Sequence, residues 1–326
     1  MERLINFSGI GFEIGQKKIG LGLTTQFARK YFYQLKNFGI QVIDQGDVIS
    51  QKLTTPVEIY SKKDILKIQL ENYKNAYLKS LNLLNKGLPL INWGGDHSIA
   101  ISTVSAFLNY YQDGYVIWID AHADLNLPEK SLTGNFHGMP LSILLNLNNI
   151  GKDYFPWIEH FLCPSKLIYI GLRDVDDFEY QTIQELGITT FFKNDIDNIG
   201  IQNVIEQVQV KTKNFPLHIS FDIDSIDPSF APSTGVHALN GITPDDLYLF
   251  GNSLNKNQST ICSIDIVEIN PTLGTESDRD NTYTLANNFL NSIFNNHLKG
   301  VKNVSMGKRN QRNYGFKVER NLQIST

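Results

Sequence analysis

The sequence has little of what secreted or nucleic-acid-binding proteins normally carry. It contains only Cys163 and Cys262 in 326 residues. Two thiols cannot form a disulfide framework, so a reducing compartment is expected. Positive charge is also not in excess, because 29 Lys and Arg residues stand against 33 Asp and Glu residues, a formal net charge of −4. A nucleic-acid-binding protein normally shows a basic excess, so that class is disfavoured.

Long apolar runs are absent as well. No stretch approaches the ~20 uninterrupted apolar residues that cross a membrane. The segment from Met1 to Gly20 lacks a signal-peptide pattern, because Glu2, Arg3 and Glu13 interrupt its apolar residues. We therefore expect a cytoplasmic protein without a membrane partner.

What the sequence does contain is enough apolar material for a sizeable core: 41% of the residues are hydrophobic and 19% are charged. Short apolar runs bounded by Gly, Pro, Asp or Asn predict buried strands. Several are almost entirely apolar, as in a parallel sheet with both faces covered. The predicted strands are Ile40 to Ile43, Leu88 to Trp93, Tyr115 to Ile119, Leu167 to Ile170, Leu217 to Phe221 and Ile261 to Val267.

Helical patterns lie between these strands. Apolar residues recur at spacings of three and four from Leu66 to Leu84, and Thr243-Pro244-Asp245-Asp246 is typical of a helix start. Further helices are predicted over Ser98 to Tyr111 and Asn281 to Leu298. The alternation predicts a single α/β domain over residues 1–300 with a mainly parallel sheet. A polar, basic tail follows over residues 301–326, either as a solvated terminus or as a subunit contact.

Three clusters of polar residues follow predicted strands. They are Gly94-Gly95-Asp96-His97-Ser98, Asp120-Ala121-His122-Ala123-Asp124 and Asp222-Ile223-Asp224. Ligand sites in open α/β sheets form at the carboxyl ends of strands, so the clusters are expected to meet in one crevice. Alternation along an extended segment would place Asp120, His122 and Asp124 on one side.

Together these clusters would bring four carboxylates and two imidazoles within a few ångströms. Such carboxylates repel one another and lose hydration unless cations neutralise them. Two divalent cations ~3.5–4 Å apart would remove the repulsion. Oxygen and imidazole ligands without thiolate favour Mn²⁺. The predicted ligands are His97, Asp120, His122, Asp124, Asp222 and Asp224.

These clusters, together with two further motifs, strongly resemble the ureohydrolase family, which includes arginase, agmatinase and their relatives. The resemblance rests on GGDHS at 94–98, DAHADLN at 120–126, SFDIDSIDPSFAPSTG at 220–235 and DIVEINP at 265–271. It runs from Gly15-Gln16 to about Leu290. It implies a single three-layer α/β/α domain with a parallel sheet of about eight strands. It also implies two manganese ions per chain and a homo-oligomer, either a trimer or a hexamer.

The resemblance implies a role for each matching residue. Asp120 and Asp222 would bridge the two ions, with His97 and Asp124 on one ion and His122 and Asp224 on the other. Glu268 would pair with the guanidinium group of the substrate and aim its carbon at an activated water. Asp124 would accept a proton from that nucleophile, and His137 would act as a proton shuttle.

The loop after the second cluster resembles the arginase pattern. In that pattern Asn126, Ser131 and Thr133 would contact the α-carboxylate of the substrate. Asp176 and Glu179, in a second arginase-like stretch, would contact its α-amino group. The expected reaction is the hydrolysis of L-arginine to L-ornithine and urea.

Three residues depart from the family pattern. Val236 stands where the family commonly has Thr, His237 follows it, and Trp93 is bulkier than the usual aliphatic residue. Trp93 would either pack in the core or reshape the pocket. These departures leave open an agmatinase, guanidinobutyrase or formimidoylglutamase activity, or a catalytically weak member that acts as a binding protein. A nucleotide-binding protein is suggested only by Gly9-Ile10-Gly11, which lacks the third glycine of the dinucleotide motif.

Overall fold

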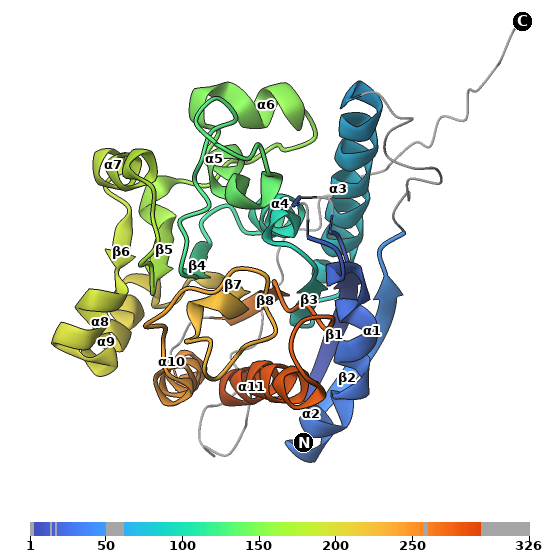
Figure 1. The fold of residues 1–326 in the computed structure, drawn as a ribbon, viewed down its shortest axis with the longest axis vertical. Coiled ribbons are helices and arrows are strands. Elements are labelled where there is room, and N and C mark those ends of the chain that lie inside the picture. Colours follow the sequence, from blue (N-terminus) through green and yellow to red (C-terminus); the bar gives the residue numbers. More distant parts are fainter. Residues whose placement is uncertain (1–2, 14, 17, 50–61, 257–259, 295–326) are drawn as a thin grey trace, which may run out of the picture. The chain divides into compact units, whose positions relative to one another are not determined.

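Eight strands form one sheet in which every neighbouring pair is parallel, in the order β2-β1-β3-β8-β7-β4-β5-β6 (Figure 1). The computed structural model describes residues 3–13, 15–16, 18–49, 62–256 and 260–294. The predicted basic tail, 301–326, lies outside the described residues. The strands are β1 (Arg3–Ile10), β2 (Ile40–Asp47), β3 (Leu90–Gly94), β4 (Tyr115–Ile119), β5 (Leu167–Ile170), β6 (Thr189–Phe191), β7 (Pro216–Asp222) and β8 (Thr260–Val267).

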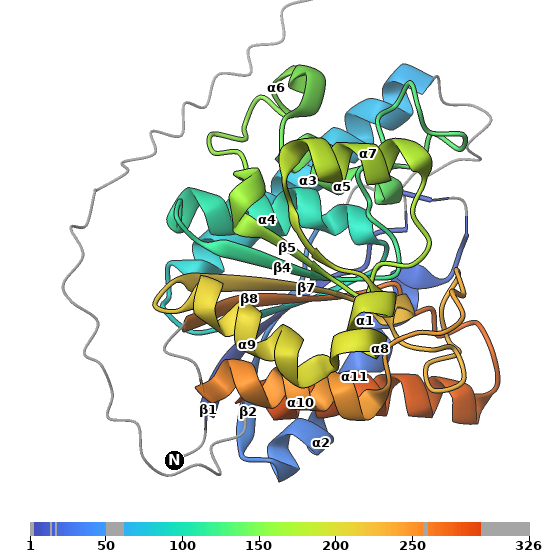
Figure 2. The same ribbon diagram turned by 90° about the vertical axis from the view of Figure 1, so that its left-hand side faces the viewer.

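Helices cover both faces of this sheet, which gives the expected three layers (Figure 2). Helices α3, α4, α5 and α7 pack on one face, and α1, α2 and α8 to α11 pack on the other. The helices are α1 (Thr24–Lys30), α2 (Phe32–Asn37), α3 (Lys62–Leu84), α4 (Ala100–Tyr110), α5 (Pro140–Leu144), α6 (Ile150–Tyr154), α7 (Asp177–Leu186), α8 (Lys193–Ile199), α9 (Ile201–Thr212), α10 (Pro244–Lys256) and α11 (Glu276–Phe294).

Strand β4 shows why the central strands read as continuous apolar runs. Val116 and Trp118 pack against the face that carries α3 and α4, whereas Ile117 and Ile119 pack against the opposite face. All four side chains are buried. Because successive residues of a strand point to opposite faces, a strand covered on both sides needs apolar residues at every position.

Two strands escape the apolar-run criterion. Strand β1 carries Asn6 and Ser8, which are buried despite being polar, and so it does not read as an apolar run. Strand β6 has only three residues and begins with two threonines.

The predicted helices are present, with shifted ends. The helix expected from Ser98 begins as a 3-10 turn over His97–Ile99 and continues as α4. Helix α10 begins at Pro244 with Thr243 Oγ1 accepting the Asp246 N–H at 3.2 Å, as the sequence predicts. The start predicted for the last helix is wrong by five residues: α11 begins at Glu276 rather than at Asn281. Thr275 caps it, since its Oγ1 accepts the Asp278 N–H at 3.2 Å.

No described helix is both long and apolar enough to cross a membrane.

The order of the strands decides where the polar motifs meet, because β3, β8, β7 and β4 are consecutive neighbours in the sheet. Their carboxyl ends therefore lie at one edge. Each of these ends is followed by one of the polar motifs identified in the sequence.

Candidate metal centre and substrate site

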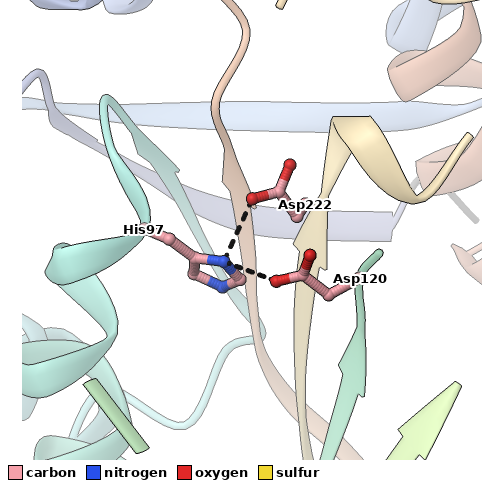
Figure 3. Close-up of side chains that lie close together, drawn as sticks. All are labelled: His97, Asp120 and Asp222. Carbon is pink, nitrogen blue, oxygen red and sulfur yellow. Dashed lines mark ion pairs between the residues drawn. The ribbon is translucent and has the colours of Figure 1, made fainter. Parts of the chain in front are cut away.

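His97 and three carboxylates form the buried centre of the site. Its Nδ1 atom lies 3.1 Å from Oδ2 of Asp120, of Asp124 and of Asp222. Figure 3 shows His97 with the carboxylates of Asp120 and Asp222 turned toward its ring. Nδ1 is buried and has no hydrogen-bond partner among the described residues. A buried nitrogen that has no hydrogen-bond partner and faces carboxylate oxygens is typical of a cation-binding site.

A second group lies next to the first. His122 Nδ1 lies 3.2 Å from Asp224 Oδ2 and 3.5 Å from Asp120 Oδ1. Asp120 therefore presents one oxygen to each histidine, which suits a carboxylate shared by two ions. Asp222 differs from the expectation, because its Oδ1 accepts the Asp224 N–H at 2.9 Å and only its Oδ2 faces His97. The residues that could hold a cation thus fall into His97, Asp120 and Asp222 on one side and Asp120, His122 and Asp224 on the other.

The electrostatics of this centre favour cation binding. Burial, followed by the charges of Asp224 and Asp120, raises the pKa of Asp222 well above its ordinary range. Burial likewise raises the pKa of Asp224 to about 6, against the opposing effect of His122. Burial alone would lower the pKa of His97, but the carboxylates of Asp120, Asp124 and Asp222 beside its ring raise it well above its ordinary value. Without cations, protons must balance the carboxylates, so metal binding would release protons.

The convergence of Asp120, His122 and Asp124 does not arise from the predicted strand alternation. Strand β4 ends at Ile119 and the following segment is irregular. The side chain of Asp120 bends the chain by accepting the His122 N–H at 2.8 Å, and Asp124 adopts a left-handed φ of 51°. The expected grouping is therefore achieved by a turn, because an extended continuation would carry Asp124 away from the edge of the sheet.

Two neighbours that sequence reasoning did not single out orient the predicted ligands. Ser220 Oγ lies 2.8 Å from His97 Nε2. If Nε2 carries the hydrogen and donates it to Ser220, Nδ1 keeps its lone pair for a cation. Trp118 stacks on the His97 ring with centroids 4.0 Å apart and donates from Nε1 to Asp120 Oδ2 at 3.0 Å. Trp118 carried no signal because it stands within a continuous apolar run.

Arg173 is a further residue that sequence reasoning missed. Its guanidinium donates to the carbonyl oxygens of Gly171, Asp224, Ser225, Ala238 and Leu239 at 2.7–3.2 Å. These bonds tie the loop after β5 to the backbone that carries Asp224. The position of Arg173 beside Asp174 in the arginase-like stretch was its only sequence signal. Asp174 itself lies 3.5 Å from His122 Nε2 and is largely exposed.

Glu268 lies at the edge of the centre in a constrained backbone conformation. Its φ is 63°, and its N–H donates to the carbonyl of Gly95 at 2.8 Å. Glu268 Oε1 accepts the His97 N–H at 3.0 Å and lies 3.3 Å from His137 Nδ1. Burial alone would lower the pKa of His137, but the Glu268 carboxylate raises it to about 9. Left-handed backbone at a non-glycine residue is typical of functional sites.

The predicted substrate-binding residues lie on two neighbouring loops. Asn126 Nδ2 donates to Asp176 Oδ2 at 2.9 Å, so the residues expected at the carboxylate and ammonium ends are adjacent. Glu179 is buried, and its two oxygens accept the N–H groups of Leu125 at 2.8 Å and Asp176 at 3.2 Å. Burial raises the pKa of Glu179 to about 7. Glu179 therefore fixes both loops to each other.

Ser131 and Thr133 lie in an exposed turn, with their hydroxyl oxygens 3.4 Å apart. Ser131 Oγ accepts the Gly134 N–H at 3.1 Å, and Thr133 Oγ1 accepts the Asn135 N–H at 3.3 Å. One hydroxyl group donates to the other across the 3.4 Å contact, and the second keeps its hydrogen available for a ligand.

The three departures from the family pattern have different surroundings. Trp93 is buried in the core, where it stacks on Tyr283 with centroids 5.7 Å apart and donates to Thr24 Oγ1 at 3.1 Å. Core packing is thus the correct interpretation of Trp93. Val236 is half-buried in the loop that follows Gly235, and His237 is exposed with Nε2 lying 2.9 Å from the Pro232 carbonyl.

Comparisons with known proteins agree with this geometry. The family model described as the Arginase family matches residues 5–295. An arginase from Coccidioides posadasii is 42% identical over 288 residues, which cover 82% of this chain and 86% of that protein. Among solved structures, arginase from Bacillus caldovelox has a TM-score of 0.80 at 28% identity and covers 90% of this chain and 98% of its own. Entamoeba histolytica arginase in complex with L-ornithine has a TM-score of 0.79 at 28% identity, with the same coverage of 90% and 98%.

Proposed function

Since the chain belongs to the arginase family, whose members are hydrolases acting on guanidino groups, we propose that it hydrolyses L-arginine to L-ornithine and urea. The family is metal-dependent, and the chain has two clusters of Asp and His that could hold cations. The substrate and the identity of the metal are the parts of this proposal that go beyond family membership.

Two Mn²⁺ ions fit the ligands best. The donors are carboxylate oxygens and imidazole nitrogens without a thiolate, a set that suits manganese. His97, Asp124 and Asp222 would hold one ion, His122 and Asp224 the other, and Asp120, which presents one oxygen to each histidine, would contribute to both. When bound, the cations would lower the pKa of a water molecule and so make hydroxide available near neutral pH.

The remaining chemistry belongs to groups of the protein. Glu268 would pair with the guanidinium nitrogens and hold the central carbon toward the nucleophile. Asp124 would accept the proton that the nucleophile gives up. His137, whose pKa is raised to about 9 beside Glu268, would donate a proton to the departing amine.

The observation that carries the substrate proposal is the 2.9 Å contact between Asn126 and Asp176. A neutral amide donor suits a carboxylate and an acid suits an ammonium, so the pair matches an α-amino acid head group. Ser131 and Thr133 add hydroxyl groups on the loop that carries Asn126. Glu179 holds this loop to the loop of Asp176 by accepting the N–H groups of Leu125 and Asp176. Agmatine carries no α-carboxylate and would leave these donors unpaired.

The test is product release after Mn²⁺ loading. Urea would be measured with arginine, agmatine and guanidinobutyrate, and formamide with formiminoglutamate. The proposal expects the highest kcat/KM with arginine. A preference for another substrate would replace the arginase assignment by that activity. No release from any of them, with both metal sites filled, would favour a catalytically weak member that acts as a binding protein.

We extend the proposal to assembly and compartment: a homo-oligomer, either a trimer or a hexamer, in the cytoplasm. Light scattering of the purified chain measures the first, and fluorescence microscopy of a tagged chain in its own cell measures the second. A monomer would contradict the proposed assembly, and a chain inside a membrane-bounded organelle would contradict the proposed compartment.

A further inference from the structure

The carboxylate of Glu268 is held by a residue from the opposite end of the chain. Gln16 Nε2 donates to Glu268 Oε1 at 3.0 Å and to Oε2 at 2.7 Å. The two residues are 252 positions apart in the sequence. The amide therefore spans both oxygens of the group proposed to receive the guanidinium.

The segment that carries Gln16 is itself fixed. The Gly15 N–H donates to Asp96 Oδ2 at 2.8 Å, and the Gly15 carbonyl accepts the His137 N–H at 3.1 Å. Asp96 is fully buried, and its other oxygen accepts the Ser98 N–H at 3.0 Å. A Cβ atom on Gly15 would lie 2.4 Å from Asp96 Oδ1 and 2.6 Å from Ser98 Oγ. The N–H and the carbonyl of Gly15 are thus both hydrogen-bonded, and the backbone lies so close to Asp96 and Ser98 that only glycine fits there.

Besides Gln16, two groups contact the Glu268 carboxylate, and both reach only Oε1: the His97 N–H at 3.0 Å and His137 Nδ1 at 3.3 Å. Contacts to one oxygen leave the carboxylate plane free to rotate about the terminal side-chain torsion. Torsions of this kind are intrinsically broad. A donor that reaches both oxygens defines the plane as well. Among the described residues, Oε2 accepts only from Gln16, so it keeps a lone pair for a substrate N–H.

We propose that Gln16, docked through Gly15 on Asp96, is a positioning residue that sets the plane of the Glu268 carboxylate for the substrate's guanidinium. This inference rests on the proposed function, because it concerns the group assigned to bind guanidinium. A planar, bidentate partner is sensitive to that plane, whereas a round ammonium is not. Gln16 acts through Glu268 and needs no contact with the reacting carbon.

The test compares the Gln16→Met variant with wild type, both loaded with Mn²⁺. Methionine is similar in length and removes the donor. Because a hydrogen bond to a charged group is lost, kcat/KM for arginine should fall about tenfold, with the larger share in KM. Inhibition by guanidinium ion should weaken by a similar factor. Inhibition by L-ornithine, which has no guanidinium, should stay the same, as should the metal content. The matched control is Ile19→Ala, at an exposed position in the same loop. Its kcat, its KM and its inhibition constants should equal those of wild type.

Gly15→Ala provides an independent route to the same result, because its methyl group would push the loop off Asp96 without altering Gln16. It should reproduce the selective weakening of guanidinium inhibition. A Gln16→Met enzyme with wild-type KM, kcat and guanidinium inhibition would overturn the inference, and so would equal weakening of guanidinium and ornithine inhibition. A lower KM would also overturn it, because Gln16 would then compete with the substrate. Failure of the proposed function is a separate result, seen as no product release by wild type.

Discussion

The metal cluster and the substrate loop are held in opposite ways. The carboxylates around His97 are buried, and the N–H groups of Trp118, His122 and Asp224 hold those of Asp120 and Asp222. Ser131 and Thr133 lie in an exposed turn whose tip, Leu132, is fully exposed, and among the described residues their hydroxyl groups bond only within that turn. The proposed metal chemistry is therefore placed at the buried end of the sheet, while the proposed substrate contacts lie on loops that can vary without disturbing it.

The largest expected effect comes from breaking the cluster itself with Asp222→Asn. The change replaces the carboxylate of a proposed ligand, whose Oδ2 lies 3.1 Å from His97 Nδ1, by a neutral amide. Metal retention should fall by more than the roughly 10–100-fold typical of residues that only support a ligand, and turnover should fall with it. Metal content and urea release are the measurements. Full wild-type activity in a chelated sample confirmed to be metal-free would contradict the metal-dependent mechanism.

A smaller effect is expected from Asp176→Ala, which alters only the substrate loop. The acid is remote from the reacting carbon, so KM for arginine should rise about 10- to 100-fold while kcat changes little. The constants for agmatine should change much less, and the preference for arginine should shrink. Metal content serves as the control. If kcat fell as strongly as KM rose, the two regions would not be separable as argued.

Glu179, which holds the two predicted substrate-binding loops together, should make stability depend on pH. Its pKa is raised from 4.5 to about 7 by burial. Between these values the folded chain keeps a proton that the unfolded chain has released. This contribution to stability is fully present below about pH 4.5 and is lost as the pH rises through about 7.

The matched comparison for this pH effect is Glu179→Gln, which cannot ionise. In metal-free samples, the Tm advantage of wild type over the variant should decrease from pH 4.5 to about 7 and then level off. Other titrating groups cancel in the difference. A Tm difference that stays constant over this range would show that Glu179 is not protonated in the folded chain.

The sequence predicted most of the sheet, for a physical reason. The ends of β4 and β5 match the predicted runs, because strands covered on both faces leave a continuous apolar signal. Strand β1 was missed since Asn6 and Ser8 are buried polar residues that break this signal. The six proposed metal ligands were identifiable because they cluster in short motifs at strand ends, where the order of the sheet brings them together.

What could not be predicted is geometry that depends on distant parts of the chain. The left-handed conformations of Asp124 and Glu268 have no local signal such as glycine. The contacts of Gln16 with Glu268 and of Arg173 with the loop around Asp224 join segments far apart in the sequence. Such contacts follow from the packed fold and from no periodicity, so only the structure reveals them.

The smallest expected effect concerns Val236, the half-buried position beside Gly235 where the family commonly has Thr. If arginine is the substrate, Val236→Thr restores the hydroxyl that the family resemblance implies near the substrate, and a recovered hydrogen bond is worth roughly 0.5–1.5 kcal/mol. The variant should therefore raise kcat/KM for arginine by up to about tenfold. Val236→Ala controls for the change in side-chain shape, since it adds no hydroxyl. Unchanged or lower kcat/KM in Val236→Thr would show that the pocket has adapted to valine, or that arginine is the wrong substrate, and the substrate comparison above separates these explanations.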